Sequence, residues 1–123
     1  MRSPPFDIGR TTRNALGKIR FEGIPNPSSV CTEESVNVNQ KSISNGSTMR
    51  MAPLAVYLSK MENPNDVKKA VKIDTNHTHS SKIVEDCNFT IAMCVRSLLR
   101  GEGPLTAYQA AKDLCLDYKT EVK

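Results

Sequence analysis

The stretch KSISNGSTMRMAPLAVYL, residues 41–58, decides how the chain is interpreted. Its first half gathers small hydroxyl side chains around Asn45-Gly46, and its second half is apolar. Asn-Gly is typical of a turn, and Ser47 or Thr48 behind it is a suitable N-cap for a helix. The alternative is that the turn holds a ligand, because glycine and hydroxyls at a helix N-terminus suit a phosphate. The residues alone leave both interpretations open.

The remainder of this stretch and the residues after it predict helices. An apolar face recurs at helical spacing, with Pro53 tolerated in a first turn; its members are Ala52, Leu54, Ala55, Tyr57, Leu58 and Met61. Asn63-Pro64-Asn65 breaks this helix, and an Asn or Asp cap starts a second one in NDVKKAVKI, residues 65–73. The polar link 76–81 follows.

Two more helices are expected toward the C-terminus. Residues 82–100 carry a stripe at spacings of three and four, predicted to be buried: Val84, Cys87, Ile91, Cys94 and Leu98. Other faces carry Lys82, Glu85, Asp86 and Arg96, and Gly101 suits the position just after the helix. Thr106 and Gln109 form a capping-box pattern that predicts a last helix through Leu114.

The N-terminal third is predicted to be less regular. Residues 11–19 suit a short helix capped by Thr11 or Thr12, and residues 21–43 are polar and predict a long surface loop. No strand pattern competes, so the fold class predicted for residues 1–123 is all-α, an irregular helical bundle in a single domain. Phe89, Met93 and Leu99 give the last helices a second apolar face. We therefore expect the domain to be partial, with neighbouring helices outside these residues.

Composition narrows the function classes. The net charge is +4, but the Lys and Arg residues are scattered along the chain and only 5% of the residues are aromatic. This composition does not indicate specific nucleic-acid recognition. No segment resembles a signal peptide or a membrane span, so the expected location is intracellular, in the cytoplasm. The cysteines lack a C-x-x-C pair and are expected to be free thiols: Cys31, Cys87, Cys94 and Cys115. The oligomeric state is not predicted.

Three segments together resemble a known family. They are DIGRTTRNAL at 7–16, SNGSTMRMAPLAVY at 44–57 and THSS at 78–81, in that order and before a long helix. They are similar to the central portion of the ADP-ribosylglycohydrolases, which include ADP-ribosyl-acceptor hydrolases and the enzyme that reactivates dinitrogenase reductase. The resemblance runs from about Phe6 to the end of the chain. It implies a larger all-α fold and cleavage of the N- or O-glycosidic bond that joins ADP-ribose to a protein acceptor or another leaving group.

The resemblance also implies a ligand site. In such enzymes the Asn-Gly loop lies along the diphosphate and the adenosine-side ribose, and the histidine of the Thr-His step touches the same ligand. Carried over by position, the ligand-binding residues are Ser42, Ser44, Asn45, Gly46, His79 and Gly9. The partner implied is ADP-ribose or an ADP-ribosylated protein.

Departures from the family pattern limit the catalytic expectation. Arg10 stands where the family commonly has Asn, and Lys41 replaces a frequent glycine. The family binds two Mg²⁺ ions through a Thr-Asp-Asp cluster and an Asp-x-Asp-Thr segment, and neither motif occurs in these residues. Asp74-Thr75 supplies a single carboxylate, so we expect no metal ligand there and no catalytic residue in the chain. His77 is expected to be a solvent-facing neighbour of His79.

Two classes of function follow. The first is a magnesium-dependent glycosidase or a portion of one, inactive on its own. The alternative is a non-catalytic relative that binds ADP-ribose, or one that serves as a helical scaffold.

Overall fold

The computed structural model describes residues 9–17, 19 and 26–117, and this part of the chain is all-α, without strands. The elements are α1 (Arg10–Leu16), α2 (Pro27–Asn39), the 3₁₀ helix η1 (Asn45–Arg50), α3 (Met51–Leu58), α4 (Pro64–Asn76), α5 (Lys82–Leu99) and α6 (Pro104–Asp117). Within these residues no helix combines the length and the apolar character needed to cross a membrane.

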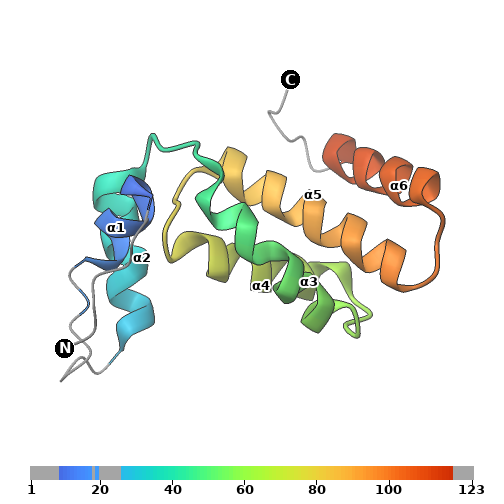
Figure 1. Ribbon diagram of the computed structural model, residues 1–123, viewed down its shortest axis with the longest axis horizontal. Helices are drawn as coiled ribbons and strands as arrows, with labels where there is room; N and C mark the ends of the chain where they lie inside the picture. The colour runs from blue at the N-terminus through green and yellow to red at the C-terminus, as the bar shows by residue number, and fades with distance from the viewer. Residues whose placement is uncertain (1–8, 18, 20–25, 118–123) are drawn as a thin grey trace.

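Helix α5 is the centre of the fold. It packs against α3, α4 and α6, while α1 and α2 pack together at one end of the molecule (Figure 1). The buried core lies where α3, α4 and α5 meet, and its members are Met51, Ala55, Leu58, Val67, Val71, Phe89 and Ala92. Removing these apolar side chains from water is the main stabilising contribution of such a cluster.

Local signals set the ends of the central helices. The Asn63 side chain accepts a hydrogen bond from the Asn65 backbone N–H at 2.9 Å, so Asn63 caps α4, and the helix begins earlier than the Asn65 or Asp66 cap that the sequence predicts. Gly101 has φ 86°, and its N–H and that of Glu102 donate to the carbonyls of Leu98 and Ser97. This Schellman arrangement ends α5 where the sequence places its end.

The burial predicted for α5 is partly wrong. Val84 is buried, but Cys87, Ile91 and Cys94 are only half-buried and Leu98 is exposed. The side of the helix that faces the molecule includes Glu85, Asp86, Asn88, Phe89, Ala92 and Arg96. The apolar stripe was misleading because the polar side chains find partners: Asp86 pairs with Lys82, and Arg96 donates to the backbone carbonyls of Met61 and Glu62.

The long polar loop predicted for residues 21–43 is also wrong, because α2 occupies Pro27–Asn39. Asn26 caps it, accepting from the Ser29 backbone N–H at 3.3 Å. Its buried residues are small or polar, Cys31, Ser35 and Asn39, each four residues after the last. A pattern based on apolar side chains therefore does not detect this helix.

Smaller differences concern caps and the face of α3. Helix α1 begins after Gly9 without a side-chain cap, α6 begins at Pro104 so that Thr106 lies inside it, and neither Ser47 nor Thr48 caps α3. On α3, Met51, Ala55 and Leu58 are buried, whereas Ala52 and Tyr57 are exposed because they lie on the side away from α5.

Candidate ligand-binding site

The polar turn lies directly against the Thr-His step. Ser44 lies just before η1 in an extended conformation, and its hydroxyl oxygen is 2.9 Å from His79 Nε2, across 35 residues of sequence. His79 follows the end of α4, where its backbone N–H donates to the Thr75 carbonyl at 2.9 Å. The turn and His79 therefore lie close together in the structure, as the sequence predicts.

Helix α1 adds hydroxyl groups to the same place. Thr11 Oγ1 lies 2.8 Å from Ser42 Oγ and accepts from Ser44 Oγ at 3.2 Å. Ser42 Oγ donates to Ser44 Oγ at a longer 3.4 Å. Three hydroxyls and one imidazole thus form a single group, which we call the turn cluster: Thr11, Ser42, Ser44 and His79.

A buried amide fixes the segments that carry the turn cluster. The Asn39 Nδ2 group at the end of α2 donates to the Thr11 carbonyl at 2.8 Å and to the Thr78 carbonyl at 2.9 Å. Asn39 is almost fully buried. One side chain therefore ties α1 to the link before α5.

A second buried amide holds η1. Asn88 on α5 donates to Ser47 Oγ at 2.8 Å and to Thr75 Oγ1 at 3.0 Å, and its Oδ1 accepts from Thr48 Oγ1 at 2.9 Å. The hydroxyls of Ser47 and Thr48 therefore bind a neighbouring helix, and this explains why they do not act as caps.

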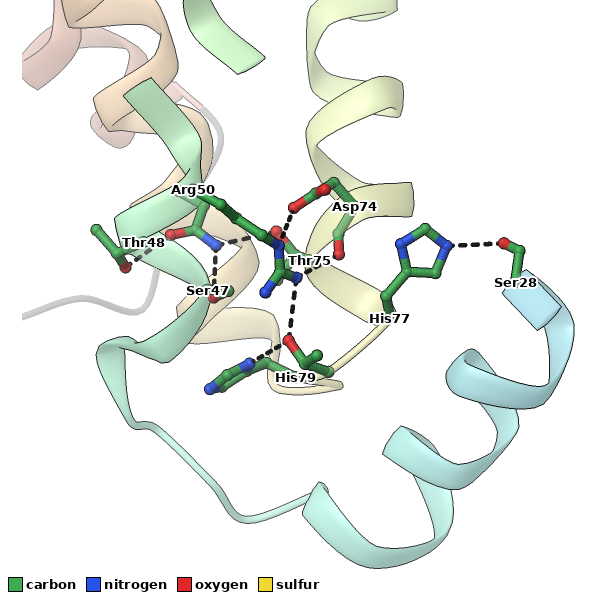
Figure 2. Close-up of polar contacts among 10 residues, drawn as sticks. Ser28, Ser47, Thr48, Arg50, Asp74, Thr75, His77 and His79 are labelled. Atoms are coloured by element: carbon green, nitrogen blue, oxygen red, sulfur yellow. Dashed lines mark hydrogen bonds and ion pairs between the residues drawn. The ribbon is translucent and has the colours of Figure 1, made fainter. Parts of the chain in front are cut away.

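Arg50, at the end of η1, connects the turn to α4. Its Nε donates to the Asp74 carboxylate at 2.6 Å, and its Nη2 donates to the Asp74 carbonyl at 2.6 Å and to Thr78 Oγ1 at 3.0 Å (Figure 2). Asp74 is thus engaged by a guanidinium. Among the described residues no group of three or more His, Cys, Asp or Glu side chains is placed to hold a metal ion.

His79 is completely buried, with both ring nitrogens occupied. Nδ1 lies 2.7 Å from Thr78 Oγ1, opposite the Ser44 contact at Nε2. Burial lowers the pKa of His79 below its ordinary value of 6.5, and the positive charge of Arg50 lowers it further. The imidazole is therefore neutral at physiological pH.

The remaining predicted site residues lie at or near the surface. Asn45 is exposed, and Gly46 is half-buried against His79: a Cβ added there would lie 3.4 Å from His79 Cε1 and 3.5 Å from Thr12 Oγ1. Gly9 is exposed at the start of α1, and a Cβ added there would have nothing within 4 Å. Gly9 immediately precedes α1, the helix that supplies Thr11.

Other predicted side chains have separate roles. His77 Nε2 lies 2.7 Å from Ser28 Oγ, which joins α4 to α2, and it takes no part in the turn cluster (Figure 2). Among the described residues, Cys31, Cys87 and Cys94 are not joined in disulfide bonds. The side chain of Cys115 lies outside the described residues.

Sequence reasoning missed Thr11, Arg50 and Thr78. Thr11 was interpreted as a possible cap, although its position two residues after Gly9 in DIGRTT was a signal. Arg50 and Thr78 both belong to segments that carried the resemblance, SNGSTMR and THSS. Their polar partners become visible only when α4 folds back onto η1.

Comparison with known proteins concerns the chain as a whole. A family model described as ADP-ribosylglycohydrolase matches residues 1–123, the whole of the chain. Neither a curated protein nor a solved structure was found to match. The segments of the resemblance that the structure describes converge on the turn cluster, and the chain belongs to the ADP-ribosylglycohydrolase family.

Proposed function

We propose that the turn cluster and the adjoining Asn45-Gly46 bind the ADP-ribose unit of an ADP-ribosylated substrate, in a protein of the glycosidase class. The observation that carries the proposal is the 2.9 Å contact between Ser44 and His79. This contact joins the polar turn and the Thr-His step into one polar group that extends to the protein surface. Membership of the family implies ADP-ribosylated substrates.

The chemistry of the turn suits a diphosphate. Ser44 and Asn45 are exposed, so a hydroxyl and an amide can donate to phosphate oxygens, and the small Gly46 leaves space beside them. His79 lies behind Ser44 and is buried. A ligand oxygen that takes the place of the Ser44 hydroxyl would accept a hydrogen bond from the imidazole directly.

The family is generally metal-dependent, and the described residues do not fit a metal. The Asp74 carboxylate, which is linked to η1 through Arg50, lies 2.6 Å from the Arg50 guanidinium. In the described part of the chain no group of three or more His, Cys, Asp or Glu side chains could hold a metal ion. We therefore assign binding to the turn cluster and derive no bond-breaking step from it.

The proposal is tested by calorimetric titration of the full chain with ADP-ribose. Ser44→Ala, Asn45→Ala and His79→Ala should each weaken binding by about 1–3 kcal/mol, the value of a hydrogen bond to a charged ligand group. Ser29→Ala is the matched control, because that exposed hydroxyl on α2 donates to the carbonyl of Asn26, just before the helix. Unchanged affinity in all three site variants would overturn the proposal.

One observation favours a second candidate, a purely structural role. The hydroxyls of the turn cluster satisfy one another and His79 without a ligand. Under that account Ser44→Ala and His79→Ala lose stability, and the wild-type chain gives no saturable heat with ADP-ribose.

A further inference from the structure

A continuous line of hydrogen bonds runs from α4 through His79 to the surface. It begins at Asp74, which holds Arg50, passes from Arg50 Nη2 to Thr78 Oγ1, and reaches His79 Nδ1. From His79 Nε2 it continues to Ser44 Oγ. Each step is between 2.6 and 3.0 Å, within the range of well-formed hydrogen bonds.

The first donor gives this line a direction. A guanidinium only donates, so Thr78 Oγ1 accepts from Arg50. Thr78 is almost fully buried, and among the described residues the acceptor available to its hydroxyl proton is His79 Nδ1, at 2.7 Å. The reverse arrangement, with a proton on Nδ1, would leave the buried Thr78 proton without an acceptor, which is unfavourable.

The remaining proton of the neutral imidazole must then lie on Nε2. It points to Ser44 Oγ, and Ser44 in turn donates to Thr11 Oγ1. Thr11 can donate to Ser42, whose hydroxyl donates back to Ser44. With Nε2 protonated, every hydroxyl of the turn cluster has an acceptor.

We infer that Arg50 and Thr78 are positioning residues that hold His79 as the neutral Nε2–H tautomer, with its N–H aimed at the ligand side of the turn. The part of the inference that concerns a ligand rests on the proposed function. A ring nitrogen that carries a proton favours ligand oxygens that only accept hydrogen bonds, such as those of a diphosphate. The charged groups linked to His79 by these contacts are Arg50 and, through it, Asp74. The charge of Arg50 and the burial of the ring both disfavour a second ring proton.

Side-chain nitrogen NMR of the uniformly ¹⁵N-labelled full chain tests the inference without a ligand. Long-range ¹H–¹⁵N correlations distinguish a protonated from an unprotonated ring nitrogen, and the chain contains two histidines. At pH 7 His79 should show Nε2 protonated and Nδ1 unprotonated, and His77 serves as the internal reference. An Nδ1–H signal, or a doubly protonated ring, for His79 in the wild-type chain overturns the inference.

Variants then separate positioning from packing. Thr78→Val keeps the shape but removes the hydroxyl, so the pure Nε2–H signal should give way to a mixture of tautomers, and Thr78→Ser should restore it. In Arg50→Lys, the lysine side chain cannot bridge Asp74 and Thr78 as the guanidinium does, so this variant should also show a mixture of tautomers. The control is Arg13→Lys, on the exposed side of α1, which should leave the tautomer of His79 unchanged.

An unchanged tautomer in both Thr78→Val and Arg50→Lys contradicts the positioning role. If a variant fails to fold, the wild-type spectrum still decides. If that spectrum is as expected but ADP-ribose does not bind, the proposed function fails while the tautomer assignment stands.

Discussion

Ser44 Oγ and His79 Nε2 lie 2.9 Å apart, although 35 residues separate them in the sequence. Their contact closes η1 onto the link between α4 and α5. Because Ser44 is exposed and His79 is not, the pair joins a surface hydroxyl to a buried imidazole. The predictions below test what this relationship does for stability and for binding.

Gly46→Ala should weaken ADP-ribose binding and leave the fold intact. A Cβ at this position meets His79 Cε1 at 3.4 Å and Thr12 Oγ1 at 3.5 Å, which is ordinary van der Waals contact. The methyl group would therefore fit, but it would fill the space beside the imidazole. Calorimetric titration should show an affinity loss, and urea unfolding a change within about 0.5 kcal/mol.

The matched control is Gly103→Ala, where an added Cβ has nothing within 4 Å. It should leave the affinity unchanged. If Gly46→Ala binds ADP-ribose as tightly as the control does, the ligand does not approach the turn at this glycine.

Asn88→Ala should destabilise the chain strongly. The side chain is fully buried and joins Ser47, Thr48 and Thr75, so its removal leaves several polar groups without partners. We expect a loss of roughly 1–3 kcal/mol for a buried group left unpaired, measured by urea unfolding. Asn37→Ala, on the exposed side of α2, should cost far less. Equal losses in the two variants would mean that the Asn88 network contributes little.

Two leucines test which sides of α3 and α5 are buried. Leu58 is 1% exposed in the core, whereas Leu98 on α5 is 44% exposed. Leu58→Ala should cost about 2–5 kcal/mol of unfolding free energy, and Leu98→Ala clearly less. Half-buried Ile91 should give an intermediate loss on substitution by Ala. A larger loss at Leu98 than at Leu58 would restore the stripe predicted from sequence and contradict the orientation of α5.

Stability should fall as the pH is lowered through 6.5. The folded-state pKa of His79 is lowered, so below 6.5 the unfolded chain takes up a proton that the folded chain does not. The free energy of unfolding therefore decreases from that pH down to the folded pKa and is unaffected by this group above it. His79→Gln should remove this part of the slope and His77→Gln should keep it, both followed by urea unfolding across the pH range. A slope that persists in His79→Gln would assign it to other groups.

The central helices could be predicted because their signals are local. Asn63-Pro64 begins α4 and Gly101 ends α5, and each acts through the backbone within a few residues. The same Asn-Pro sequence occurs at Asn26-Pro27, but no apolar stripe follows it to indicate a helix. Helix α2 is buried through Ser35 and Asn39, whose suitability for the interior depends on distant partners.

The site was predictable in part for a similar reason. The resemblance brought the turn and His79 together, and the structure agrees. The contributions of Thr11, Arg50 and Thr78 depend on tertiary contacts across 24 to 33 residues, which no local pattern contains. For the same reason the sequence pattern does not reveal that Glu85, Asp86 and Arg96 lie on the buried side of α5.

The most direct test of ADP-ribose binding at the turn is a backbone ¹H–¹⁵N NMR titration of the wild-type chain with ADP-ribose. The account predicts saturable shifts at the amides of residues 44–48, together with a change in the His79 ring nitrogen signals as a ligand oxygen replaces the Ser44 hydroxyl. Titration without saturable shifts would contradict the account. Saturable shifts confined to another part of the fold, such as the hollow between α5 and α6 lined by Met93, Arg100 and Leu114, would contradict it equally.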